Sequence, residues 1–303
     1  MKYAIPFTMF CLCTLFSLNS LANECPSNWK TLNPAWLWCD DFETDKAASY
    51  FEKTGPFNRT AGVGFNGSFG MKSTWTSGSE DGGSLKLAFG LTPPGSGITP
   101  PAGLDTTTRF REIYYRVYLK SQTGWISGAN SGSKFTRATS FVAVDWSQAM
   151  IAHVWSSGTN NNYLGIDPAS CVSGSTVQCV GYNDFAHIAW LGAVDGTTAI
   201  FTSPNAGTWN CIETHVKLND AGLSNGVEEF WIDGRLEASR TNLNFVGSYS
   251  TYGINAILLE NFINNGSPQA QSRYWDNLVV STQRIGCSVD SLIAAPQNLR
   301  IIN

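Results

Sequence analysis

The stretch REIYYRVYLK, residues 111–120, alternates between two kinds of side chain. Successive side chains of an extended chain point to opposite faces, so this stretch would have one apolar and one polar face. The apolar face carries Ile113, Tyr115, Val117 and Leu119. The polar face carries Glu112, Tyr114, Arg116 and Tyr118. This period of two predicts a β-strand that packs one face into a core and turns the other outward.

The same alternation recurs along the chain between Gly, Asn, Ser and Pro residues. The other segments that we predict as strands are 84–91, 138–146, 150–156, 186–194, 209–218, 228–238, 254–262 and 273–281. Helical spacing lasts no more than a turn or two, around residues 45–51. Many short strands separated by turn residues predict an all-β sandwich or barrel. The Pro- and Gly-rich tract 90–103 is expected to form a long surface loop.

Composition narrows the class of protein further. Of the 303 residues, 14% are charged, 13% are aromatic and 29 are glycine. A disordered chain would be poor in aromatics and rich in charge, and a helical bundle would be rich in Ala, Glu, Lys and Leu. The formal net charge is −4. We therefore expect no nucleic-acid partner, because phosphate binding needs a basic face.

Residues 1–22, MKYAIPFTMFCLCTLFSLNSLA, have the features of a secretory signal peptide. Lys2 supplies a positive start, an apolar stretch follows, and Ser20-Leu21-Ala22 is a small-x-small cleavage site. A membrane anchor is the alternative, but it needs about 20 apolar residues and this run is shorter. We predict an exported protein, secreted or periplasmic, with no membrane anchor. It would consist of the signal peptide, one domain at 23–287 and a tail at 288–303.

Cys11 and Cys13 lie in the signal peptide, and the other six cysteines follow it. An even number of cysteines in an exported chain indicates disulfides. A metal site is the alternative, but it would need tightly spaced Cys and His clusters, which the sequence lacks. The spacing favours two bridges that close short loops and one that ties an interior strand to the last one. These pairs are Cys25–Cys39, Cys171–Cys179 and Cys211–Cys287.

Three segments together suggest a family. They are WLWCDDFET (36–44), the strand–turn–strand segment TWNCIETHVKLND…NGVEEFWIDGRLE (208–237), and RYWDNLVVSTQRIGC (273–287). This set resembles the concanavalin-like β-jelly-roll domains of secreted polysaccharide lyases. Glucuronan lyases, the alginate-lyase-like group and a related cellulose-induced fungal protein are the families that it resembles. The resemblance implies a sandwich of two antiparallel sheets in which the first and last strands are neighbours.

The resemblance also implies a structural calcium ion between those two strands. The matching acidic residues are Glu43 and Asp276, and carbonyl oxygens of the loop 64–70 would complete the shell. The residues themselves support this hypothesis, because Ca²⁺ prefers six to eight oxygen ligands and Asp41 shares a strand face with Glu43. The alternative is that these acids only cap a strand end at the surface.

In such a jelly roll, long sugars lie along one sheet. The polar face of 111–120 is our candidate for that surface, with Glu112 and Tyr118 as substrate-binding residues. Aromatic rings can stack on sugar faces while charged groups bind hydroxyls and carboxylates. The alternative is a solvated sheet face with a cross-strand ion pair.

Three histidines can be weighed for catalysis. His153 shares a strand face with Trp155, a second candidate for sugar binding, and His187 lies in a similar setting. His215 lies in a charged stripe that we assign to the solvated, convex sheet. A histidine beside a tryptophan can serve as a base. The alternative for His153 is a buried structural histidine.

Cleavage of a uronate chain by β-elimination needs three groups. One neutralises the carboxylate, one removes the C5 proton, and one protonates the leaving oxygen. Arg116 suits the first role, while His153 and a tyrosine, Tyr114 or Tyr182, suit the others. Tyr182 is also a candidate for substrate binding.

Two functions from different classes follow. The first is a calcium-stabilised, secreted polysaccharide lyase that acts on a uronate-containing glycan. The second is a non-catalytic, lectin-like carbohydrate-binding protein of the same fold. A hydrolase has little support, because the chain lacks an E-x-D-x-E triplet. Glu229 and Asp233 share a strand face, but the resemblance implies that their segment is a structural strand before an Asp-Gly turn. The expected partner is a polysaccharide, and we expect a monomer.

Overall fold

The computed structural model describes residues 24–128, 130 and 132–287. The predicted signal peptide at 1–22 and the predicted tail at 288–303 lie outside the described residues. Within the described ranges, no helix has the length and apolar character needed to cross a membrane. The helices are short and lie outside the sheets: α1 (Trp29–Leu32) and the 3₁₀ turns η2 (Ala47–Ser49), η3 (Phe65–Gly67) and η4 (Thr159–Asn161).

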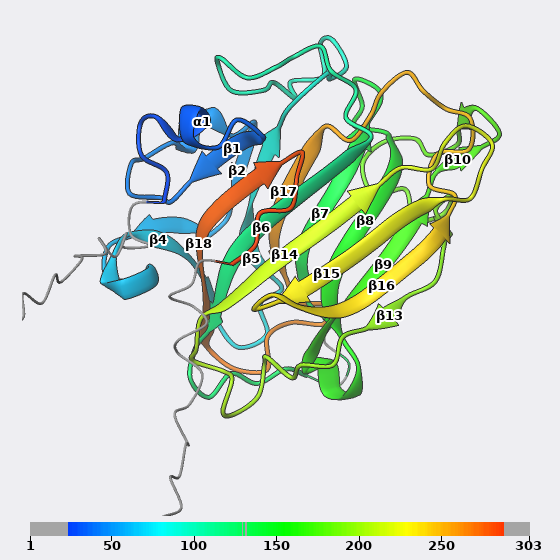
Figure 1. Ribbon diagram of the computed structural model, residues 1–303. Coiled ribbons are helices and arrows are strands. Elements are labelled where there is room, and N and C mark those ends of the chain that lie inside the picture. Colours follow the sequence, from blue (N-terminus) through cyan, green and yellow to red (C-terminus); the bar gives the residue numbers. More distant parts are fainter. Residues whose placement is uncertain (1–23, 129, 131, 288–303) are drawn as a thin grey trace, which may run out of the picture.

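The strands of the described chain form two large antiparallel sheets, which Figure 1 shows stacked as layers, and a small separate hairpin. Sheet 1 has the order β16-β15-β14-β6-β18-β4-β3, with β1 paired to β18. Its strands are β1 (Trp36–Asp40), β3 (Asn58–Thr60), β4 (Gly70–Trp75), β6 (Glu112–Ser121), β14 (Asn210–Lys217), β15 (Gly226–Ile232), β16 (Arg235–Leu243) and β18 (Gln271–Ser281). This sheet confirms the expected pairing of the first strand with the last.

Sheet 2 has the order β12-β9-β8-β7-β17-β5-β2, with β13 paired to β9. Its strands are β2 (Glu52–Thr54), β5 (Asp81–Ala88), β7 (Lys134–Phe141), β8 (Gln148–Ser157), β9 (Tyr163–Ser170), β12 (Ala189–Trp190), β13 (Val194–Asp195) and β17 (Ala256–Phe262). A small hairpin, β10 (Val172–Ser173) and β11 (Thr176–Val177), lies beyond the end of β9. The two sheets confirm the predicted all-β, jelly-roll sandwich.

The core lies between the sheets. The apolar face of β6 is buried in it as predicted, with Ile113, Tyr115, Val117 and Leu119 each at most 1% exposed. Contact between the layers is direct, since Trp275 of β18 stacks on Phe135 of β7 with ring centroids 4.5 Å apart. Because inward and outward side chains alternate, each sheet also has an outer face, and these two faces are the candidate places for function.

The three predicted disulfides are confirmed. The structure contains the pairs Cys25–Cys39, Cys171–Cys179 and Cys211–Cys287. The last pair spans 76 residues and ties β14 to the segment after β18. The first pair links Cys25, near the beginning of the described range, to β1.

Several strand predictions are wrong in detail. Segment 186–194 contains only the two-residue strand β12 and the start of β13, because Gly192 has a φ of +102° that breaks the extended chain. Strand β7 ends at Phe141, because the following residues turn through Trp146, whose φ is +68°. Strand β9 was not predicted, since Gly165 and Pro168 mask its alternation. The tract 90–103 is confirmed as a loop without strands.

Candidate active site on the outer face of sheet 2

The structure separates the residues that we expected to act together. Tyr114 and Arg116 belong to β6 in sheet 1, whereas His153 belongs to β8 in sheet 2. Both strands turn these side chains away from the core, so they lie on opposite sides of the sandwich. The prediction of one shared surface for Tyr114, Arg116 and His153 is therefore wrong. Alternation identifies the face of a strand that a side chain occupies, but not the sheet to which the strand belongs.

Arg116 has a structural environment. It is 2% exposed, its Nη2 lies 2.5 Å from Glu24 Oε2, and its Nη1 donates to the carbonyl of Gly286 at 3.0 Å. The two ends of the described chain thus cover it. Tyr118, also on this face, is fully buried and packs edge-on against Phe65. Neither side chain is exposed to a polysaccharide, which contradicts the expected sugar surface here.

Glu112 and Tyr114 contact His215 on the neighbouring strand β14. His215 Nε2 lies 2.8 Å from Glu112 Oε1, and Nδ1 lies 3.2 Å from Glu229 Oε2. The Tyr114 ring stacks on the imidazole with centroids 4.2 Å apart. The charged stripe around His215, which we assigned to a solvated sheet, therefore lies on the same sheet face as Glu112 and Tyr114. This face matches the alternative that we gave for β6, a sheet face with cross-strand contacts between charged groups.

Sheet 2 presents a row of charged residues across its strands. The cross-strand partners run from Glu52 on β2 through Lys86 and Leu258 to Arg137, His153 and Asp167. Directly opposite residues of neighbouring strands have their side chains in contact range. We call this set, Glu52, Lys86, Arg137, His153 and Asp167, the charged row. So many ionisable groups on one sheet face make it the candidate active site.

A buried ion pair anchors the row. Arg137 donates from Nε to Glu260 Oε2 at 2.7 Å and from Nη2 to Glu260 Oε1 at 2.6 Å. Arg137 is fully buried and Glu260 is 6% exposed. Burial alone would raise the pKa of Glu260, but the charge and hydrogen bonds of Arg137 hold that pKa below its usual value. The site therefore keeps a fixed cation and a fixed anion side by side.

His153 is a neutral imidazole with one bare nitrogen. Burial, reinforced by the charge of Arg137, lowers the pKa of His153 well below its ordinary value. Nδ1 lies 3.3 Å from the carbonyl oxygen of Asp167. Because a carbonyl only accepts, Nδ1 carries the proton and Nε2 presents a lone pair. Nε2 is buried and has no hydrogen-bond partner among the described residues, which suits it to accept a proton.

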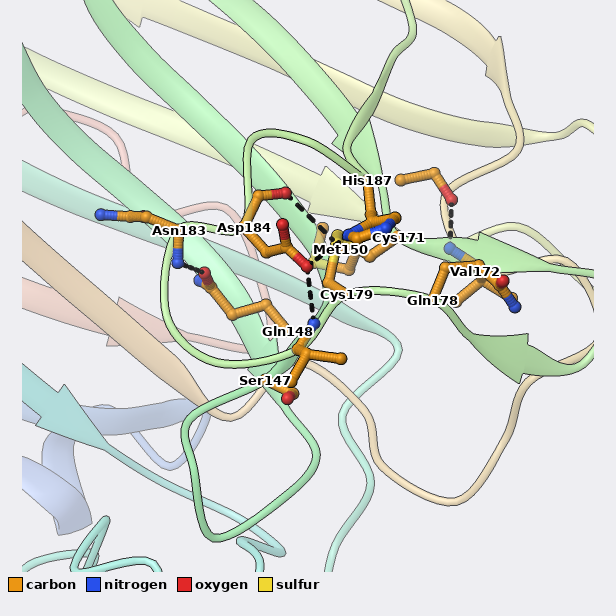
Figure 2. Close-up of a disulfide and its surroundings, with 12 residues drawn as sticks. Ser147, Gln148, Met150, Cys171, Val172, Gln178, Cys179, Asn183, Asp184 and His187 are labelled. Carbon is orange, nitrogen blue, oxygen red and sulfur yellow. Dashed lines mark hydrogen bonds and ion pairs between the residues drawn. A yellow bond between two sulfur atoms is a disulfide. The ribbon is translucent and has the colours of Figure 1, made fainter.

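The loop 178–188 covers one side of the row. Tyr182 donates its hydroxyl to Glu260 Oε1 at 3.2 Å, and Asn183 Oδ1 accepts from Arg137 Nη1 at 2.6 Å. Figure 2 shows how the loop is tied down: the Cys171–Cys179 bridge begins it, and the Asn183 amide donates to Gln148 Oε1 at 3.2 Å. Burial raises the pKa of Tyr182, so its hydroxyl stays protonated at neutral pH.

Two half-exposed charged groups flank His153. Lys134 Nζ lies 5.0 Å from the centre of the Phe262 ring and, among the described residues, has no hydrogen bond or ion pair. Burial lowers the pKa of Lys134. Asp167, the cross-strand partner of His153, has its pKa raised by burial to about 6. Lys134 interacts electrostatically with Glu260 but makes no hydrogen bond to it among the described residues. Such a cation beside a free base is an arrangement that can bind and deprotonate an acidic sugar.

The structure places the remaining predicted residues differently. Trp155 lies beside His153 as expected, with ring centroids 4.3 Å apart. His187 is 57% exposed and forms an ion pair with Asp184 at 2.7 Å, as Figure 2 shows. It is held in the loop by that contact and lies in the solvent rather than on the sheet. Tyr182 is the predicted tyrosine that reaches the row.

Sequence reasoning missed Arg137, Glu260, Lys134 and Asp167. A signal for them exists, since each is a charged residue within a segment of otherwise small or apolar side chains. Glu260 interrupts AILLENF and Asp167 interrupts YLGIDPAS. Burial of a charged side chain in a strand costs free energy of folding, so such a side chain is usually paired or has a function. Charged residues in such strands are therefore candidates for a functional site in the same way as Arg116.

The residues of the predicted calcium site lie close together but are only partly consistent with it. Asp276 is 1% exposed, and burial, together with the charges of Glu43 and Asp41, raises its pKa to about 8. A cation would offset that repulsion. However, the loop 64–70 directs N–H groups at these acids, from Phe65 to Asp276 Oδ2 at 2.6 Å and from Phe69 to Glu43 Oε1 at 3.0 Å. Among the described residues, no group of three or more acidic, His or Cys side chains is arranged to hold a metal.

Comparison with solved structures identifies the fold. The glucuronan lyase of the fungus Trichoderma reesei has a TM-score of 0.50 and 13% identity, with 82% of this chain and 91% of that chain covered. The alginate lyase vAL-1 from Chlorella virus has a TM-score of 0.52 and 14% identity, covering 78% and 94%. The PL-14 alginate lyase from Aplysia kurodai has a TM-score of 0.54 and 11% identity, covering 82% and 99%. The chain has the jelly-roll fold of these polysaccharide lyases.

This jelly-roll similarity is visible only in three dimensions. No protein-family model matches the sequence, and no curated protein matches it. The fold resemblance that we drew from segments 36–44 and 273–287 is confirmed, because those segments form the paired strands β1 and β18.

Proposed function

We propose that this protein is a polysaccharide lyase that cleaves a uronate-containing glycan at the charged row of sheet 2. The observation that carries the proposal is the free Nε2 of His153, held neutral next to buried Arg137. The lyases that share the fold act on alginate or glucuronan by their names, and this supports the substrate class. In this proposal, residues of sheet 2 take the roles that we had expected for Arg116 and Tyr114.

The proposed reaction uses three groups. Lys134, with the buried charge of Arg137 behind it, neutralises the uronate carboxylate and so acidifies the C5 proton. His153 Nε2 takes that proton as the C4–O bond breaks, and the electron pair forms the C4–C5 double bond. The Tyr182 hydroxyl then gives its proton to the leaving oxygen, and water restores both side chains. His153 is 2% exposed, so a sugar reaches Nε2 only when the neighbouring rings shift.

The second candidate is a non-catalytic, lectin-like protein that uses the same face. Exposed aromatic side chains beside the row favour it, since rings bind sugars without chemistry. The two functions can be distinguished because only the lyase forms a product. A lyase leaves an unsaturated uronate, which absorbs ultraviolet light, whereas a lectin leaves the chain intact.

A substrate panel tests this difference. We expect absorbance of unsaturated uronates to rise when the protein is incubated with at least one of alginate, glucuronan, pectate or a glycosaminoglycan. The heat-treated protein is the control. Binding to a polymer without any rise in absorbance would overturn the lyase and leave the lectin.

We also propose a structural calcium ion held by Asp276 and Glu43, with backbone carbonyls completing its shell. The raised pKa of Asp276 supports it, because its carboxylate is destabilised where it lies. Without metal, the folded pKa of about 8 exceeds the unfolded value of about 3.9. Asp276 therefore favours the folded state below pH 4, and that contribution is lost as the pH rises through 8.

Calcium removal has a defined expected result. In EDTA, we expect the melting temperature to fall between pH 5 and pH 8, and added Ca²⁺ to restore it at pH 8. Asp276→Asn should remove the response to Ca²⁺, whereas Asp220→Asn, in an exposed turn, should keep it. Identical melting curves in EDTA and in Ca²⁺ at pH 8 would eliminate the site.

Export is the last part of the proposal. The three disulfides among the described residues support an oxidising compartment, either outside the cell or in a periplasm. A long polysaccharide substrate outside the cell agrees with that location.

A further inference from the structure

Exposed aromatic rings gather next to the charged row. Trp190 of β12 is 44% exposed, and Phe185 of the loop before it is 49% exposed. Their rings are nearly parallel, 14° apart, with centroids separated by 6.3 Å. Rings that pack into a core lose this exposure, so the pair presents apolar ring surface to solvent.

This surface continues into the candidate active site. Trp190 lies 6.0 Å from Trp155 and 5.8 Å from His153, measured between ring centroids. Backbone pairing sets the contact, because Trp190 lies opposite Ala169 on β9, which lies opposite Ile151 on β8. The small Ala169 side chain leaves the face of Trp190 uncovered on the sheet.

Unpartnered polar atoms lie under the same rings. Trp155 Nε1 and His153 Nε2 are both buried and lack a hydrogen-bond partner among the described residues. A buried polar atom without a partner is costly, so a ligand that reaches these atoms gains free energy. Lys134, the cross-strand neighbour of Trp155, adds an ammonium group that makes no hydrogen bond among the described residues and interacts with Glu260 only through its charge.

We infer that Trp190, Phe185 and Trp155 form a subsite on which a pyranose ring of the bound polysaccharide stacks. We call these three residues the aromatic platform. The inference rests on the proposed polysaccharide substrate, but it does not depend on whether the chain is cleaved. The apolar face of the sugar lies on the rings, and its hydroxyls or carboxylate reach Trp155 Nε1 and Lys134. This occupant fits better than a second protein chain, because buried polar atoms and an ammonium border the apolar rings.

The platform also accounts for how a sugar reaches His153. Trp190 is exposed and lies above the imidazole, whereas Arg137 and Glu260 below are fixed by their ion pair. A sugar that binds to the Trp190 ring, or displaces it, can therefore reach His153 Nε2. Binding at the platform therefore positions the sugar next to the base.

The test compares Trp190→Ala and Phe185→Ala with Leu32→Ala, a matched exposed apolar residue. Leu32 is 60% exposed in α1, at the opposite side of the molecule from β9 in Figure 1. Affinity electrophoresis in gels that contain alginate or glucuronan measures binding, and the panel assay measures KM and kcat. We expect each platform variant to raise Kd or KM about two- to tenfold, and Leu32→Ala to change neither. Trp190→Phe keeps a ring and should recover most of the binding.

The outcomes separate the two proposals. If the protein binds without cleavage and Trp190→Ala weakens binding, the platform stands and the lyase falls. If the protein cleaves and Trp190→Ala leaves KM unchanged, the lyase stands and the platform falls. A protein that neither binds nor cleaves any polymer of the panel overturns both. A change of oligomeric state in Trp190→Ala, seen by light scattering, would assign the rings to a protein interface and overturn the platform.

Discussion

We expect His153→Gln to lower kcat on the cleaved polysaccharide by about 10²- to 10⁴-fold, the contribution typical of a positioned base. Glutamine fills similar space but has no lone pair with the basicity of imidazole nitrogen. KM should change little, because the charged and aromatic groups that bind the sugar remain. Steady-state kinetics from the absorbance of the unsaturated product give both numbers.

His215→Gln is the matched control, since His215 is the other histidine buried in a sheet and lies on sheet 1. Its kcat should equal that of the wild type.

The pH profile of the rate is an independent test of His153 as the base. Because the pKa of His153 lies well below 6.5, the base stays deprotonated and the rate should not fall as the pH drops through 6.5. A loss of rate centred at pH 6.5 would indicate that the pKa of His153 is not lowered. Asp167 has a pKa of about 6 and could cause the same loss, so the loss must persist in Asp167→Asn to count against the proposal.

Glu260→Leu should cost about 3–5 kcal/mol of the free energy of unfolding, because it leaves Arg137 charged, buried and unpaired. Arg137 would retain only the Asn183 hydrogen bond on its side-chain nitrogens, at Nη1. Urea denaturation with an unchanged m value measures this loss.

The double variant Arg137→Leu/Glu260→Leu separates pairing from packing. Replacing both ions removes the unpaired charge, so the double variant should be more stable than the single one. A single variant that loses less than about 1 kcal/mol, or a double variant that is less stable than the single, would contradict the buried pair.

The architecture was largely predictable from local pattern. The alternation in 111–120 predicts which side chains of β6 enter the core, and the structure buries all four. The cysteine spacing predicts two of the bridges for a similar reason, because they join residues already close along the chain, and the third joins the two cysteines that are left. These features depend on neighbours in sequence, so a single sequence contains them.

The candidate site was predictable only in part, because it depends on pairing between distant strands. His153, Trp155 and Tyr182 were identified, yet their partners Arg137 and Glu260 come from segments separated by 123 residues. Arg116 has the same residue type and a similar strand position as Arg137. What distinguishes them is that Glu24 and Gly286, near the two ends of the described range, contact Arg116. No hydrophobic periodicity or sequence motif predicts that contact.

The two faces of the sandwich explain why the choice of sheet matters. On sheet 1, the histidine His215 is held between two glutamates, and both nitrogens are engaged. On sheet 2, His153 keeps one nitrogen free beside cations. A base needs the second environment, because a ring nitrogen that donates a hydrogen bond to a carboxylate already carries a proton and has no lone pair free to take one from carbon.

Side-by-side assay of the wild type, His153→Gln and His215→Gln decides whether sheet 2 performs the chemistry. The absorbance of unsaturated uronates is followed on whichever polymer the wild type degrades. We predict product from the wild type and from His215→Gln, and almost none from His153→Gln. Full product from His153→Gln, or its loss in His215→Gln with the fold intact, would contradict the assignment of the reaction to sheet 2.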